Sequence, residues 1–414
     1  MKELFNDYVQ SLETYIMFRI KQKTAELTPM LKEKGRSPIS LSMGAPVDSP
    51  PQYAINKLME VLQTDKNVHT YSNPKGEKYL TDAIIERMKR VYNVDLENNE
   101  VHSLIGSKEG IANFIRELIN PNTNEKEKDI ILVPDPGYAS YVQMVTVSGG
   151  LAYPMPLTPE NNYMPDFEDV LKQLEKDGYN PQKVKAVAFN YPNNPMGAIC
   201  TKEYMQKAVD FCIKHHFILL SDAAYIDLNL PNTEKIPSIL SLEKAKEVAI
   251  EFYSFSKSYA MTGWRMGWAC GNNELVEMLG KMKSSIDTGI FKPLQIAGAA
   301  ILNSKEGDEF IIEANKKYQI NLNILIDGFK KMGWDFSKLS VPKATFYLWL
   351  PVPPKFKTSE EFTNYVLETS GVVFVPGSAF GKNGEKWFRI SATATESEIK
   401  EAVDRLIKDG IKFN

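Results

Sequence analysis

The residues of this sequence that are best suited to chemistry lie in four short segments. The segments contain Asp135 and Tyr138, then Asn194, then Asp222 and Tyr225, and finally Ser254, Ser256 and Lys257, with Arg265 eight positions beyond the lysine. Lysine can form an imine with an aldehyde, and a carboxylate can keep a pyridine nitrogen protonated so that the ring accepts electrons. Arginine and hydroxyl groups can hold a phosphate, and an aromatic ring can stack on a pyridine face. These side-chain types predict a site for a phosphorylated pyridine aldehyde.

Each segment directly follows a short apolar run, at residues 130–133, 186–189, 217–220 and 248–252. Near-continuous apolar runs predict strands of a parallel sheet covered on both faces, because a sheet with one exposed face would alternate polar and apolar residues. Ligands of such sheets bind beyond the carboxyl ends of the strands. We therefore expect the four segments to share one pocket.

The rest of the chain predicts an α/β fold, with a mostly parallel sheet covered by helices on both faces and a smaller α+β domain. A helix is expected to begin at Thr201, as N-cap, and to end at His215 and His216. Beyond residue 300, long helical patterns and aromatic strands at 345–350 and 387–391 predict the smaller domain. The expected division is an arm at 1–45 that returns to the small domain, a large cofactor-binding domain at 46–298 and a small C-terminal domain at 299–414.

Composition limits the classes of function. The chain has 414 residues, 43% of them hydrophobic, and a formal net charge of -3, which offers no electrostatic basis for binding nucleic acid or an anionic membrane. Three cysteines and the absence of a signal-peptide pattern or an 18-residue apolar run predict a cytoplasmic protein. Four histidines without ligand spacing predict no metal site. The expected partners are small molecules and a second copy of the chain.

The stretch Ser254-Phe255-Ser256-Lys257, followed by Gly263-Trp264-Arg265-Met266-Gly267, resembles the class I/II pyridoxal-phosphate-dependent aminotransferases of fold type I. The resemblance extends over nearly the whole chain. It implies that Lys257 holds pyridoxal 5′-phosphate as a Schiff base and that Asp222 faces the ring nitrogen. Tyr225 and Asn194 would bind the phenolic oxygen, and Tyr138 would stack on the ring.

The same resemblance assigns the anion-binding residues. Phosphate would be bound by Ser107 and the amides of residues 106–110, which include Lys108 and Glu109, with Ser254, Ser256 and Arg265 completing the site. Tyr71 would reach the phosphate of a partner subunit, which implies a homodimer with shared active sites. Arg389, together with Asn194, would bind the substrate α-carboxylate, and the loop at Gly44 would close over it.

The implied reaction moves an amino group between an L-amino acid and a 2-oxo acid, with Lys257 as general base beside Asp222 and Tyr225. The motifs are most similar to the branch that contains LL-diaminopimelate aminotransferases, which act in lysine biosynthesis. Aspartate, alanine or aromatic transamination, or β-elimination on the same fold, remain alternatives. Met196, Ser221 and Ser285 depart from the branch, and Asp287 is either a contributor to the partner's site or a surface acid.

Overall fold

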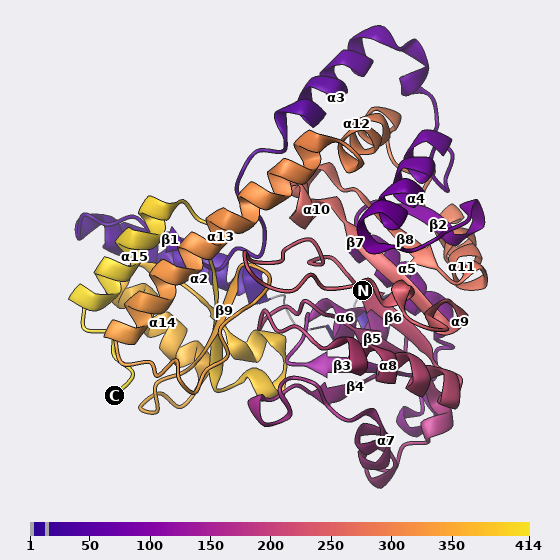
Figure 1. The fold of residues 1–414 in the computed structure, drawn as a ribbon. Coiled ribbons are helices and arrows are strands. Elements are labelled where there is room, and N and C mark those ends of the chain that lie inside the picture. Colours follow the sequence, from indigo (N-terminus) through magenta and orange to yellow (C-terminus); the bar gives the residue numbers. More distant parts are fainter. Residues whose placement is uncertain (1–3, 13–15) are drawn as a thin grey trace.

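The computed structural model describes residues 4–12 and 16–414 and contains a seven-stranded sheet in the order β2-β8-β7-β6-β5-β3-β4 (Figure 1). In this sheet β8 runs antiparallel to both of its neighbours, and the other paired strands are parallel. The strands are β2 (Val101–Leu104), β3 (Ile130–Asp135), β4 (Leu151–Pro156), β5 (Val184–Phe189), β6 (Ile218–Asp222), β7 (Ala249–Ser254) and β8 (Gly267–Gly271). The four predicted strands are therefore confirmed as β3, β5, β6 and β7.

Helices cover both faces of this sheet. Ile130 and Leu132 pack on one side with α4 (Lys78–Tyr92), α7 (Phe167–Lys176) and α8 (Lys202–His215). Ile131 and Val133 point to the other side, where α5 (Ser107–Leu118), α6 (Ser140–Val147) and α11 (Asn273–Ser284) lie. Because successive strand residues face opposite sides, burial of both sets explains why these runs are apolar throughout.

The second layer, here called the small lobe, is built mainly from the C-terminal third of the chain. It has an antiparallel sheet, β11-β12-β9, and a parallel pair in which β1 joins β10. Its elements are α2 (Ile16–Glu33), β1 (Ile39–Ser40), α13 (Lys305–Lys331), β9 (Tyr347–Pro351), α14 (Ser359–Ser370), β10 (Val372–Val373), β11 (Val375–Pro376), β12 (Trp387–Ser391) and α15 (Glu396–Lys408). Figure 1 shows the long helix α13 running from the large sheet into this lobe.

The expected fold class is confirmed, and so are the ends of the predicted helix. Thr201 is the N-cap of α8, with its side chain accepting from the amide of Tyr204, and His216 ends the helix in a left-handed conformation. The remaining helices are α1 (Asp7–Gln10), α3 (Gln52–Thr64), α9 (Ala245–Val248), α10 (Phe255–Ser258) and α12 (Lys292–Leu302). Short 3₁₀ turns are η2 (Lys66–His69), η3 (Asn98–Glu100), η4 (Glu125–Glu127), η5 (Pro159–Asn161), η6 (Pro181–Lys183), η7 (Ile239–Ser241), η8 (Thr262–Trp264), η9 (Gly377–Phe380) and η10 (Lys382–Gly384).

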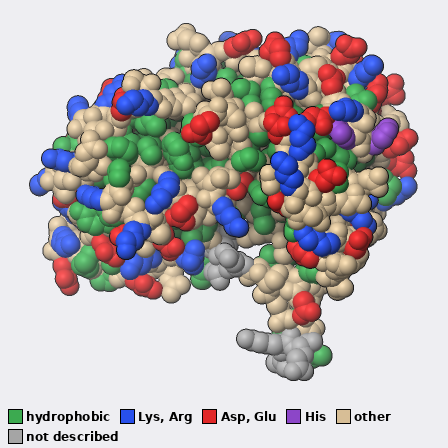
Figure 2. All heavy atoms as spheres, turned by 90° about the horizontal axis from the view of Figure 1, so that it is seen from below, with side chains coloured by type: hydrophobic (Ala, Val, Ile, Leu, Met, Phe, Trp, Pro, Cys, Tyr) green, Lys and Arg blue, Asp and Glu red, His purple; other side chains and the backbone are tan. Residues whose placement is uncertain are grey.

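The surface is mixed in charge. The face in Figure 2 carries acidic and basic side chains intermingled rather than one broad area of a single sign. Among the described residues, no helix combines the length and the apolar character that crossing a membrane requires. Within the same residues, no three histidine, cysteine, aspartate or glutamate side chains gather as a metal site would require.

Candidate active site

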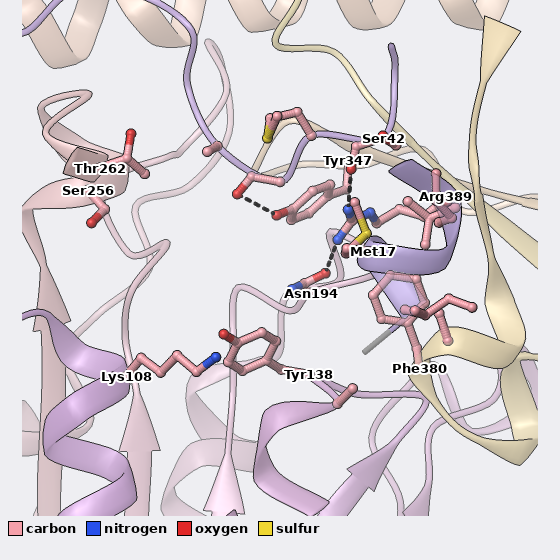
Figure 3. A pocket seen from close by; sticks show the side chains of 18 of the residues that line it. Met17, Ser42, Lys108, Tyr138, Asn194, Ser256, Thr262, Tyr347, Phe380 and Arg389 are labelled. Atoms are coloured by element: carbon pink, nitrogen blue, oxygen red, sulfur yellow. Dashed lines mark hydrogen bonds between the residues drawn. The ribbon is translucent and has the colours of Figure 1, made fainter. Parts of the chain in front are cut away.

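A cavity of about 880 Å³ lies between the carboxyl ends of the parallel strands and the small lobe (Figure 3). It brings together all of the predicted site residues except Tyr71 and Glu109. Its lining includes Gly44, Ser107, Lys108, Tyr138, Asn194, Asp222, Tyr225, Ser254, Ser256, Lys257, Arg265 and Arg389. The four segments that follow β3, β5, β6 and β7 therefore do meet, as strand order in a parallel sheet requires.

Lys257 lies in the single turn of helix α10, directly after β7. Ser254 caps this turn, since its Oγ accepts from the amide of Ser256 at 3.2 Å. The Lys257 ammonium donates to the carbonyl oxygen of Gly44 at 2.6 Å. Burial lowers the pKa of Lys257 to about 8, helped by the positive charges of Arg389 and Arg265. A lysine with this pKa is neutral in a useful fraction near physiological pH, as a nucleophile or general base must be.

Asp222 is the last residue of β6 and is buried. Its carboxylate accepts from the hydroxyl of Tyr141 at 2.5 Å and from the amide of Ala224 at 3.1 Å. Burial raises the pKa of Asp222, although these hydrogen bonds and the charge of Lys257 oppose the shift. A cation held against this carboxylate would restore its ordinary ionisation, so the group fits the protonated nitrogen of a pyridine ring.

The residues expected to hold phosphate meet at the start of α5, where Ser107 opens the helix after Gly106. Gly106 has φ +80°, and a Cβ built on it would lie 2.4 Å from Nη2 of Arg265. Only glycine therefore lets the guanidinium lie against the end of this helix. Arg265 Nη1 donates to the carbonyl of Thr262 at 2.8 Å and lies 3.5 Å from Ser256 Oγ. A helix N-terminus, an arginine and two serine hydroxyls make a donor set that suits a phosphate.

Arg389 comes from β12 and is only 4% exposed. Its Nη1 donates to Asn194 Oδ1 and its Nη2 to the carbonyl of Ser42, each at 2.8 Å (Figure 3). Its Nε is buried without a hydrogen-bond partner in the described part of the chain. A buried guanidinium of this kind suits a carboxylate ligand, which it can bind through two parallel hydrogen bonds.

Three features of the cavity were not predicted. Tyr141 donates a hydrogen bond to Asp222, and it lies only three positions beyond Tyr138, in the first turn of α6. Tyr347 is hydrogen-bonded to Tyr225 through their hydroxyls at 2.8 Å, and its ring lies 4.4 Å from the guanidinium of Arg389. The third feature is α2, which lines the cavity with one face, at Ile16, Met17, Ile20, Lys21, Thr24, Ala25 and Thr28.

Two predicted cofactor residues lie outside the cavity. The carboxylate of Glu109 accepts from the amide of Ile105 at 3.0 Å and pairs with buried Lys283 at 3.3 Å. Tyr71 is 85% exposed, so the described part of its own chain leaves it largely uncovered. Asp287 pairs with the same Lys283 at 2.7 Å and accepts from the amide of Gly289.

The residues that depart from the resembled branch have ordinary structural contacts. Met196 is buried in the core on one face of the sheet. Ser221 Oγ donates to the buried carboxylate of Glu251 at 3.0 Å. Ser285 Oγ donates to the carbonyl of Met282 at 2.7 Å, just after the end of α11.

Comparison with known proteins agrees with this geometry. Residues 36–406 match the family described as aminotransferase class I and II. The chain is 39% identical to the LL-diaminopimelate aminotransferase of Halothermothrix orenii over 98% of this chain and 99% of that protein. It is also 39% identical to the enzyme of the same name from Moorella thermoacetica, over 96% of each. The structure of substrate-bound BacF from Bacillus subtilis superposes with a TM-score of 0.89 at 31% identity, over 99% of each chain.

The chain belongs to the class I and II aminotransferase family. It is a pyridoxal 5′-phosphate-dependent enzyme that acts on amino acids and 2-oxo acids. The site residues alone do not distinguish transamination from β-elimination, and membership of this family identifies the reaction as transamination.

Proposed function

We propose that this aminotransferase transfers the amino group of LL-diaminopimelate to 2-oxoglutarate, a step of lysine biosynthesis. The observation that carries the proposal is the 39% identity of the chain to two LL-diaminopimelate aminotransferases, and the charge of the cavity agrees with it. Among the described residues, the charged side chains of the cavity lining are Lys21, Lys108, Lys257, Arg265 and Arg389 against the carboxylate of Asp222. Arg265 suits the cofactor phosphate, and Arg389 suits the α-carboxylate of the substrate. The two further lysines favour substrates with a second carboxylate, which both of these compounds have, although the distal ammonium group of LL-diaminopimelate offsets part of that attraction. Aspartate fits the same argument, whereas alanine and aromatic amino acids fit it less well.

We assign the residues that hold the cofactor from the chemistry of the cavity. Ser107, Ser254, Ser256 and Arg265 bind the phosphate, and Asp222 keeps the ring nitrogen protonated. Tyr225 and Asn194 bind the phenolic oxygen, while Tyr138 stacks on the ring face. When bound, pyridoxal 5′-phosphate supplies an aldehyde that takes up the amino group and an electron-poor ring that makes the donor Cα–H bond acidic.

The chain's own residues then orient the donor and move its proton. Arg389 binds the α-carboxylate, with its fork held in place by Asn194 and Ser42. The amine of Lys257 would remove the proton from the donor Cα and deliver it to the aldehyde carbon of the cofactor, which is the carbon that then carries the amino group. Its lowered pKa, about 8, makes the neutral form available for this role. The loop at Gly44 and helix α2 limit access of water from the small-lobe side.

An amino-donor screen with 2-oxoglutarate as acceptor tests the substrate. We expect glutamate to form fastest from LL-diaminopimelate, with turnover abolished in Lys257→Ala. Turnover of aspartate with no response to LL-diaminopimelate would replace the proposed donor. Ammonia release without a keto-acid acceptor would contradict transamination itself.

We further propose that the enzyme works as a homodimer in which exposed Tyr71 completes the partner's phosphate site. Co-expression of Tyr71→Ala with Lys257→Ala tests this, because a mixed dimer would contain one site with both residues intact. Activity well above that of either variant alone is expected, and no recovery would contradict the shared site.

The domain division at 46–298 and 299–414, with the arm 1–45 joined to the small domain, stays a prediction, supported by the pairing of β1 with β10. The cytoplasmic location also stays a prediction.

A further inference from the structure

A buried carboxylate outside the cavity, that of Asp227, receives three hydrogen bonds from two different segments, two from α4 and one from the turn α10. Arg87 Nη2 donates to it at 2.8 Å, the hydroxyl of Tyr92 at 2.5 Å and the hydroxyl of Ser258 at 2.7 Å. Arg87 is only 1% exposed. Burial by itself would raise the pKa of Asp227, but the charge of Arg87 and the hydroxyl donors lower it below its ordinary value. The group is therefore a permanent anion inside the protein.

Two of the segments that meet at Asp227 also carry proposed site residues, Lys257 on α10 and Tyr225 in the turn after β6. Ser258 is the neighbour of Lys257 and ends the same helical turn, α10. Asp227 itself lies in the turn that follows β6, two residues beyond Tyr225. Arg87 also donates to the carbonyl of Leu302 at the end of α12, and Asn315 on α13 donates to the backbone carbonyl of Asp227 at 2.9 Å. The cluster thus joins α4, the loop after β6, the lysine turn and the long helix of the small lobe.

We propose that Asp227 is a positioning residue of the transamination site. Asp227 fixes the turn that carries Lys257 through its hydrogen bond with Ser258, and so it fixes the position of Lys257 relative to Tyr225. The inference rests on the proposed role of Lys257.

Two physical arguments support a positioning role over a purely stabilising one. A four-residue turn cannot hold its own shape, because helix nucleation costs more than one turn of hydrogen bonds returns. The placement of this turn must therefore come from contacts with the rest of the protein, and the hydroxyl of Ser258 makes one of these contacts. In addition, a buried ion pair contributes little net stability compared with apolar residues of similar size, so stability alone does not account for the Arg87–Asp227 pair.

Two variants separate the roles, because each removes one neutral hydroxyl donor from the same carboxylate. Ser258→Ala breaks the tie to the lysine turn and leaves the Arg87–Asp227 pair in place. Tyr92→Phe removes one of the two bonds from α4 and is the matched control, since the Tyr92 hydroxyl, among the described residues, is hydrogen-bonded to Asp227 and not to the cavity lining. If Ser258→Ala does not accumulate as folded protein, Ser258→Cys makes the same comparison with a weaker donor.

Three properties are measured for each variant: the steady-state kinetics, the melting temperature and the reactivity of Lys257. For the last, an amine-selective reagent labels the apoenzyme at a series of pH values, and mass spectrometry measures the extent of labelling at Lys257. We expect Ser258→Ala to lower kcat about tenfold or more with little change in KM, since misplacement of a reacting group by about 1 Å can cost up to about 100-fold. The labelling midpoint should rise from about 8 towards the ordinary lysine value, because a loosened amine escapes the burial and the arginine charges that lower its pKa.

Tyr92→Phe should lower the melting temperature by a similar amount and leave kcat and the labelling midpoint unchanged. Equal kcat values and equal midpoints in the two variants would overturn the inference. That result would leave the proposed function intact as long as Lys257→Ala is inactive. An active Lys257→Ala enzyme would instead refute the proposed function.

Discussion

Replacing Arg389 with lysine should impair substrate binding far more than it impairs folding. In the structure the two terminal nitrogens of Arg389 are oriented by Asn194 and by the carbonyl of Ser42, at 2.8 Å each. Lysine keeps the positive charge but has a single nitrogen, so it cannot keep both bonds and also present two donors to a carboxylate. A hydrogen bond to a charged group contributes about 1.5 to 3 kcal/mol, and each 1.4 kcal/mol is a factor of ten. Loss of one such bond therefore predicts a fall in kcat/KM of about 10- to 100-fold.

The assay is kcat/KM for both the amino donor and the 2-oxo acid, with the melting temperature measured in parallel. Arg36→Lys is the matched control, because Arg36 makes a two-pronged pair with Asp409 at 2.6 and 2.9 Å and neither residue belongs to the cavity lining. The control should lose some stability and keep kcat/KM. The reasoning would be refuted if Arg389→Lys retained kcat/KM within about threefold of the unmodified enzyme, which is less than one charged hydrogen bond contributes.

Three further substitutions test separate parts of the cavity. Gly44→Ala places a methyl group 2.9 Å from the hydroxyl of Tyr347, and such overpacking costs about 1–3 kcal/mol. We therefore expect the KM for substrate to rise about tenfold. An unchanged KM would show that this loop does not contact substrate. Asp222→Asn keeps the shape but removes the charge, and we expect kcat to fall by about 100-fold or more, whereas a fall below tenfold in single-turnover assays would contradict its role. Lys21→Met should lower kcat/KM about fivefold for dicarboxylate substrates and leave alanine unaffected, and equal effects on both would exclude Lys21 as a reader of the second carboxylate.

The central sheet and the strand-end residues could be predicted because both follow from local pattern. Buried parallel strands are apolar throughout, and the chain connection places the polar residue that follows each strand at the same edge. Asp222 and Lys257 therefore lie in one cavity although 35 positions separate them in the printed sequence. The N-cap at Thr201 could be predicted for the same reason, because it depends on one local hydrogen bond, which the Thr201 side chain accepts from the amide of Tyr204.

The parts that could not be predicted depend on packing between distant segments. Tyr347 meets Gly44 across 303 positions, and nothing in the periodicity of either segment indicates that contact. In the structure Arg389 pairs with Trp349 across two antiparallel strands, so Tyr347, two residues along, lies on the same face as Arg389, but the sequence does not give this register. The face that α2 turns to the cavity depends on how the small lobe sits against the large sheet, which the sequence pattern of α2 does not encode.

The central claim is that Lys257 is the residue that holds the cofactor. The most direct measurement is reduction of the holoenzyme with borohydride, followed by digestion and mass-spectrometric location of the pyridoxyl group. We predict the modification on Lys257 and on no other lysine of the cavity lining. A pyridoxyl group on Lys108 or Lys21 would contradict the assignment, because both also line the cavity.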